Sequence, residues 1–160
     1  MTGRKGASGR EAHRKLGVDL FNGTWKLIEK RRRTKAEDLR MIHMAHASRY
    51  HWSLVGKPTN GAVGEWQVSH VYAILGRAEP ALYHAERCLE ICRANRLDDW
   101  QLAFAYEALA RASAVAGRRG DLRKHLAAAF RAGMKIKEKE DRDLLIRDLK
   151  TIPAVRKTRV

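Results

Sequence analysis

The sequence predicts an all-α fold built from about three antiparallel helical hairpins and a C-terminal helix. Apolar residues recur at helical spacing from residue 13 to residue 152, and no stretch alternates apolar and polar residues as a half-buried strand does. Capping residues and glycines divide this region into segments of helical length. Because the connections between segments are short, successive helices should lie antiparallel. A chain of 160 residues fits one domain.

The second helix has the clearest boundaries. Thr34 followed by Glu37 three residues later is a capping box, and Gly56 with Pro58 beyond it marks the end. Asp98 is expected to cap the fifth helix. The expected helices span residues 13–32, 35–55, 61–75, 79–94, 98–117, 120–132 and 138–151. They pair into hairpins over residues 13–56, 61–95 and 98–133, and residues 138–151 form a capping helix.

An internal repeat indicates how the hairpins are arranged. Gly76 and Gly117, which are 41 residues apart, each follow an apolar helix face and precede a second amphipathic helix. The small, aromatic and glycine positions of the two units are Ser69, Tyr72, Gly76, Ala81 and Cys88, then Ala110, Gly117 and Ala129. This pattern resembles the tetratricopeptide repeat, and its long period is similar to that of kinesin light chains. The resemblance implies a right-handed α–α superhelix, a TPR-like solenoid, in a small bacterial-type protein.

The same resemblance implies a binding role. Ligands of such repeats meet a concave groove lined by the first helix of each hairpin. The corresponding positions here are Val63, Trp66, His70, Ala73, Phe104, Glu107, Arg111 and Ala114. We therefore expect a non-catalytic domain that binds a protein or peptide, with no cofactor and no metal. Two alternatives without a binding role remain: Trp66 is a core residue, and Glu107 and Arg111 form an ordinary surface pair at i, i+4.

The stretch "MIHMAHASRYHW", residues 41–52, gathers three histidines, a tyrosine and a tryptophan. A metal site would need more donors than one His-x-x-His pair, and Ser48 lacks the partners of a catalytic triad. The favoured interpretation is packing between the first and third helices, with at least two of the cluster side chains mostly buried. A ligand pocket at the same junction is the alternative. The residues concerned are His43, His46, Tyr50 and Trp52.

The net charge of +15 is concentrated in three segments. Residues 1–18, 26–35 and 150–160 carry 13 of the 15 net charges, so the body of the chain is nearly balanced. Residues 1–12 and 153–160 are expected to be basic tails, the first of them disordered. Cations in "KRRRTK" can also offset the dipole at a helix C-terminus. Two further functions stay open: nucleic-acid binding through the tails and the Lys30–Lys35 patch, weak and non-specific, or small-molecule or metal sensing at the His43–Trp66 junction.

The remaining features concern the compartment. Cys88 and Cys92 lie four residues apart, on one helical face, and are expected to be buried free thiols. No stretch of 18 apolar residues predicts a membrane span, and no apolar run follows the basic N-terminal residues as in a signal peptide. These features favour a cytoplasmic protein that does not enter a membrane. The pattern leaves the oligomeric state open.

Overall fold

The computed structural model describes residues 3–153, which form seven α-helices and no β-strand. The helices are α1 (Gly3–Ile28), α2 (Lys35–Val55), α3 (Pro58–Ile74), α4 (Ala78–Ala94), α5 (Trp100–Val115), α6 (Arg119–Gly133) and α7 (Lys139–Lys150). The all-α prediction is therefore confirmed. None of the helices in this part of the chain is both long enough and apolar enough to cross a bilayer.

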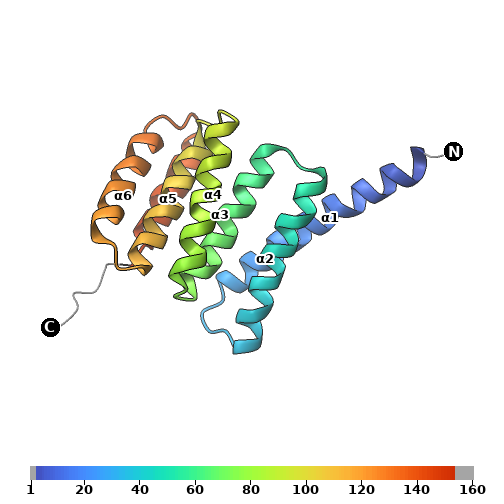
Figure 1. Ribbon diagram of the computed structural model, residues 1–160, viewed down its shortest axis with the longest axis horizontal. Coiled ribbons are helices and arrows are strands. Elements are labelled where there is room, and N and C mark those ends of the chain that lie inside the picture. The colour runs from blue at the N-terminus through green and yellow to red at the C-terminus, as the bar shows by residue number, and fades with distance from the viewer. Residues whose placement is uncertain (1–2, 154–160) are drawn as a thin grey trace.

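The helices are arranged as hairpins in chain order. α1 packs against α2, α3 against α4, and α5 against α6. Neighbouring hairpins meet through α2 with α3 and α4 with α5, and α3 also packs against α5. Figure 1 shows these pairs side by side, with the start of α1 projecting away from the other helices. α7 packs on α5 and α6 and so closes the C-terminal end of the array.

α1 differs most from its expected extent. It begins at Gly3 and ends at Ile28, instead of running from residue 13 to residue 32. Residues 3–12, expected to be disordered, are thus helical, although the side chains of residues 8–12 are all exposed. Adding a residue to an existing helix is far easier than nucleating one, so the packed part of α1 supports this extension. Residues 1–2 and 154–160 of the expected tails lie outside the described residues.

Two helix starts show where local signals succeed and fail. The predicted capping box is present: Glu37 N donates to Thr34 Oγ1 over 3.2 Å, and Thr34 N donates to Glu37 Oε2 over 2.9 Å. The predicted Asp98 cap is wrong, because Asp99 occupies the N-cap position of α5. The Asp99 carboxylate accepts a hydrogen bond of 3.2 Å from Lys137 N instead. A contact with a distant loop therefore takes the place of the local cap.

The repeat seen in the sequence recurs in the backbone. Gly76 and Gly117 have φ angles of 71° and 72°, in the left-handed region that favours glycine. In both hairpins, the residue after the glycine donates its backbone N–H to the carbonyl five residues earlier in the chain. Arg77 N donates to Tyr72 O, and Arg118 N donates to Ser113 O, each over 2.9 Å. This is the 6→1 bond of a Schellman motif, which ends a helix and turns the chain. The two turns are therefore equivalent in conformation as well as in sequence position.

Small side chains dominate the core. The main buried cluster spans α3 to α7 and consists largely of alanines, with both cysteines buried and free as predicted. A second, smaller cluster joins α2 to α3 and contains Met41, Ala45, Val68 and Val71. Alanine at helix contacts lets the backbones approach closely, which favours tightly paired hairpins. The large aromatic side chains gather at the site described next.

Candidate binding groove

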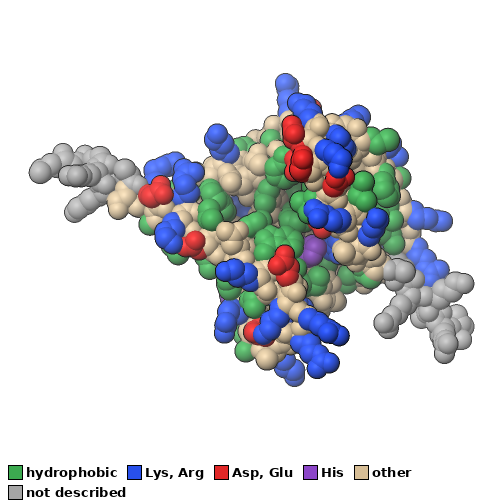
Figure 2. Space-filling view, turned by 180° about the vertical axis from the view of Figure 1, so that it is seen from behind, with side chains coloured by type: hydrophobic (Ala, Val, Ile, Leu, Met, Phe, Trp, Pro, Cys, Tyr) green, Lys and Arg blue, Asp and Glu red, His purple; other side chains and the backbone are tan. Residues whose placement is uncertain are grey.

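An apolar cavity of about 310 Å³ opens between α3, α5 and α7. Its lining consists of Ala62, Val63, Trp66, Cys88, Trp100, Gln101, Phe104, Asp141 and Leu144. Three of the predicted groove residues, Val63, Trp66 and Phe104, are therefore brought together at one cavity. Figure 2 shows hydrophobic side chains in a hollow on this face of the molecule, with acidic side chains above it and a basic cluster below. The cavity has a volume suited to a large side chain or a small ligand.

Aromatic rings form the walls of this cavity. The ring centroids of Trp66 and Phe104 lie 5.4 Å apart at 83°, and those of Trp100 and Phe104 lie 6.3 Å apart at 78°. These are edge-to-face contacts, the arrangement favoured by the ring quadrupoles. On the other side, Trp25 of α1 lies 5.4 Å from Trp66. Because each ring is held by another, the walls are preorganised.

Two other predicted groove residues are buried inside the protein. Glu107 has no exposed surface and Arg111 is 4% exposed. Arg111 Nε and Nη2 donate to Glu107 Oε1 over 2.8 and 2.6 Å, and Nη2 also donates to Asp148 O and Thr151 Oγ1. The pair therefore holds the C-terminal end of α7 against α5. It is neither an open groove surface nor an exposed surface pair, because α7 covers it.

The buried pair affects a neighbouring carboxyl group. Burial, followed by the nearby charge of Glu107, raises the pKa of Asp148 to about 6, although Arg111 and Arg147 act in the opposite direction. Asp148 is the α7 residue whose carbonyl accepts from Arg111. The end of α7 thus holds a carboxyl group that titrates well above the usual range for an aspartate.

The remaining predicted groove residues are also largely covered. Ala73 and Ala114 are buried three residues before the turn glycines. His70 is 7% exposed and lies 5.5 Å from the Trp25 ring and 5.6 Å from the Trp66 ring. Burial, followed by the charge of Arg111, lowers the pKa of His70 to about 3. Trp25 from α1 therefore shields the part of α3 that was expected to be open.

A second cavity of about 240 Å³ adjoins the first and shares Val63 with it. It lies between α1, α2 and α3, and its lining consists of Val18, Phe21, Asn22, Trp52, Asn60, Val63 and Gly64. Trp52 packs closely on α1 here: a Cβ atom at Gly17 would lie 2.8 Å from Trp52 Nε1. A glycine at position 17 thus allows α1 to approach the indole ring.

The histidine and aromatic run of α2 is divided among several environments. His43 and Tyr50, seven residues apart, are exposed on the outer face, while most of the surface of His46 and Trp52 is covered. The expectation that at least two members are mostly buried is therefore met by His46 and Trp52, because α2 packs this stripe of the run against its neighbours. The contacts reach both expected helices: Trp52 meets α1, and His46 Nε2 lies 2.9 Å from Tyr72 Oη on α3.

A polar junction that the sequence did not predict joins α2, α3 and α4. Glu65 accepts from Arg49 Nε over 3.0 Å and contacts His84 Nδ1 at 2.6 Å. Tyr72 stacks on His84, with ring centroids 5.9 Å apart. Burial raises the pKa of Glu65, but His84 and Arg49 outweigh it and the net pKa is lowered. Within residues 3–153, no three His, Cys, Asp or Glu side chains are grouped so as to hold a metal ion.

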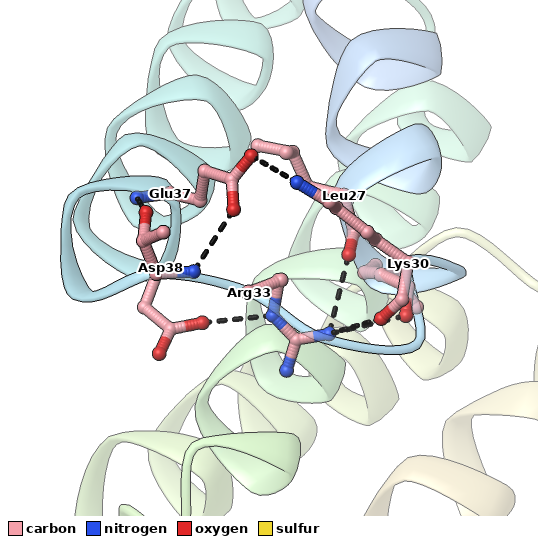
Figure 3. A network of polar contacts seen from close by, with 7 residues as sticks. Leu27, Lys30, Arg33, Glu37 and Asp38 are labelled. Carbon is pink, nitrogen blue, oxygen red and sulfur yellow. Dashed lines mark hydrogen bonds and ion pairs between the residues drawn. The ribbon is translucent and has the colours of Figure 1, made fainter.

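The basic loop after α1 is partly engaged in the fold. Arg33 Nη1 donates to the carbonyls of Leu27, Ile28 and Lys30 at the end of α1, and Arg33 Nε donates to Asp38 Oδ1 over 2.8 Å (Figure 3). Lys30 pairs with Glu37 of the capping box. The expectation that this run stabilises a helix C-terminus is confirmed for Arg33. The contact also explains why α1 ends before residue 32.

The cavity residues that sequence reasoning missed come from places that the repeat does not specify. Trp100 and Gln101 begin α5, and Asp141 and Leu144 belong to α7. A tryptophan at a helix start was the only available signal, since no pattern indicates where a capping helix will pack. No family model matches the chain, and neither the curated proteins nor the solved structures contain a significant match to it.

Proposed function

We propose that the chain is a non-catalytic helical repeat protein, TPR-like in arrangement, that binds a protein or peptide partner. The partner contributes a side chain to the cavity between α3, α5 and α7. The observation that carries the proposal is this cavity: its walls are aromatic and its volume is about 310 Å³. An apolar pocket with a few polar groups in its lining is the usual form of a ligand site.

The position of the cavity also supports this role. Val63 and Phe104 are 41 residues apart, and both line it, so corresponding sites of the two repeat units contribute to one surface. The adjoining cavity at Trp52 extends the surface across α3 toward α1. A partner that inserts one side chain at each cavity would contact three hairpins. This fits a peptide better than a compact metabolite.

The cavity chemistry favours binding over catalysis. Cys88 is the one thiol in the lining, and its hydrogen bond with Cys92, together with burial, raises its pKa well above the usual value. A protonated thiol is a poor nucleophile. Asp141 is the only carboxylate among the lining residues, so the cavity lacks a paired acid and base.

The test compares two substitutions on one helix. Leu144 lines the cavity and is 41% exposed, whereas Ile146, two residues later, is 44% exposed and lies outside it. Peptides selected from a displayed random library on the wild-type protein should lose at least about tenfold in affinity with Leu144→Arg and keep it with Ile146→Arg. Because both side chains are exposed, both variants should fold. A library that yields no binder, or binders equally weakened by both variants, would contradict the proposal.

A further inference from the structure

The cavity combines aromatic walls with hydrogen-bond acceptors. Trp66 and Trp100 each meet Phe104 nearly edge to face, so the three rings bound the space from different directions instead of stacking on one another. Aromatic ring faces carry partial negative charge and attract cations, most strongly where water is excluded. Half of the remaining lining residues are aliphatic: Ala62, Val63 and Leu144. A ligand with an aliphatic stem and a cationic head would meet complementary surfaces along its whole length.

Asp141 adds a carboxylate to this lining without a cation to neutralise it. No ion pair to Asp141 is formed within residues 3–153. Two cations close to it in the sequence are engaged elsewhere: Arg142 Nη1 donates to the carbonyls of Ile136 and Lys137, and Lys139 pairs with Asp143. The charge of Asp141 is therefore available to a ligand.

Gln101 contributes a second acceptor. Its side chain lines the cavity, and its buried Oε1 has no hydrogen-bond partner in the described structure. A buried acceptor without a donor is unfavourable, and a ligand N–H that reached it would remove that cost. The two lining side chains that carry oxygen acceptors, Gln101 and Asp141, thus favour a ligand that carries donors or positive charge.

We infer that the cavity binds the side chain of a basic residue, lysine or arginine, presented by the peptide partner. The aliphatic stem lies among Trp66, Trp100 and Phe104, and the cationic head is placed at Asp141. This inference rests on the proposed function and names the class of residue that the partner supplies. The net charge of +15 acts against it, but 13 of the 15 charges belong to residues 1–18, 26–35 and 150–160, whose described members do not line the cavity.

The first experiment isolates the charge. Hexylammonium and 1-hexanol have the same stem, and each is titrated into the full chain while tryptophan fluorescence is followed. Hexylammonium should bind about fivefold more tightly, the upper scale of one partly exposed ion pair. Asp141→Asn should remove most of this preference, whereas the matched control Asp143→Asn, at a residue outside the cavity, should leave it unchanged. Equal affinities for the two probes would overturn the inference.

The second experiment identifies the source of the cation. Two blocked tripeptides, alanine–lysine–alanine and alanine–norleucine–alanine, differ only in the charge at the end of the central side chain. The lysine peptide should bind about fivefold more tightly to the wild type, through its ion pair with Asp141, and lose that advantage with Asp141→Asn. If hexylammonium binds and the lysine peptide does not, the ligand is a free amine and the inference falls. If norleucine and hexanol bind as well as the charged probes, the inference that the cavity prefers a basic side chain is wrong, while the proposed peptide-binding function stands. If no probe binds and no peptide is selected from the library, both fail.

Discussion

The indole Nε1 of Trp66 on α3 donates a hydrogen bond of 2.8 Å to the Glu107 carboxylate on α5. The two residues are 41 positions apart, which is the period of the repeat. Both side chains stand at the same place in their repeat units, yet one is aromatic and the other acidic. The bond joins α3 to α5 directly beside the aromatic cavity. Arg111 neutralises the carboxylate and extends the network to α7. A single buried carboxylate therefore connects three helices.

Removing this carboxylate should be among the most damaging single changes. Glu107→Ala leaves the Arg111 guanidinium buried without its counter-ion and Trp66 Nε1 without an acceptor. Breaking a buried ion pair in this way costs about 3–5 kcal/mol in the free energy of unfolding. Urea denaturation followed by circular dichroism measures the loss.

The double variant provides the control for that prediction. Glu107→Ala with Arg111→Met removes both charges, so it should be less destabilised than Glu107→Ala alone. An exposed pair on α7, Lys139–Asp143, gives the external comparison, since Asp143→Ala should cost less than about 1 kcal/mol. If Glu107→Ala costs as little as Asp143→Ala, the network contributes nothing to the fold.

The contact between Gly17 and Trp52 predicts that Gly17→Ala destabilises the protein when the Trp52 indole is present and stabilises it when the indole is absent. Gly17→Ala places a Cβ atom 2.8 Å from the indole Nε1, so the ring or the helix must shift. We expect a loss of about 1–3 kcal/mol, the usual cost of overpacking. When Trp52 is first replaced by Ala, the same change should instead stabilise the protein by up to about 1 kcal/mol, because alanine is the better helix former.

The control for this prediction lies on the same helix. A Cβ atom at Gly9 would have nothing within 4 Å, so Gly9→Ala should be neutral or slightly stabilising in both backgrounds. Thermal melts of the wild type and five variants complete the comparison. Equal effects of Gly17→Ala with and without Trp52 would show that the indole does not restrict this position.

His70 should make the protein less stable in acid. Its pKa in the folded protein is lowered to about 3, below the value near 6.5 expected for the unfolded chain. The stability that depends on its neutral form is therefore fully present above pH 6.5 and is lost as the pH falls from there toward 3. From pH 7 to pH 5 this loss is about 2 kcal/mol.

The test compares unfolding free energies at pH 7 and pH 5. His70→Phe should lose about 2 kcal/mol less than the wild type over that interval. Two other histidines with lowered pKa values, His46 and His125, contribute in the same direction in both proteins. The raised pKa of Asp148 acts oppositely, since its contribution is present below about pH 4 and is lost as the pH rises through about 6. If the wild type and His70→Phe lose the same unfolding free energy between pH 7 and pH 5, His70 is not the cause of the acid sensitivity.

The basic loop should bind polyanions weakly and without sequence preference. Arg31 and Arg32 are exposed and form no hydrogen bond or ion pair among the described residues, whereas Arg33 holds the end of α1. Replacing Arg31 and Arg32 by alanine should reduce DNA binding and its dependence on salt, with the unfolding free energy unchanged.

Arg33→Ala should do the reverse, lowering stability because it removes the cap of α1. Fluorescence anisotropy with labelled DNA of two unrelated sequences, at low and physiological salt, provides the measurement. Tight binding of one sequence over the other at physiological salt would indicate a dedicated nucleic-acid site instead.

Local chemistry in the sequence was sufficient for the elements. The Thr34–Glu37 capping box and the turn glycines Gly76 and Gly117 each depend on residues a few positions apart, and each appears where the pattern predicts it. The spacing of apolar residues likewise indicated that every regular element of the described residues is a helix. Asp98 failed as a cap because α5 begins at Trp100, which makes Asp99 the N-cap residue, and the Asp99 carboxylate accepts from Lys137 N of a distant loop.

Only the tertiary structure decided which helix faces remained accessible. Glu107 and Arg111 share a face with Phe104, yet the first two are sealed under α7 and the third lines a cavity. The repeat specifies how a helix pairs within its hairpin and with the next one, but α1 and α7 pack by side-chain fit at the ends of the array. Burial depends on those partners, and long-range packing of this kind leaves no periodic trace in the sequence.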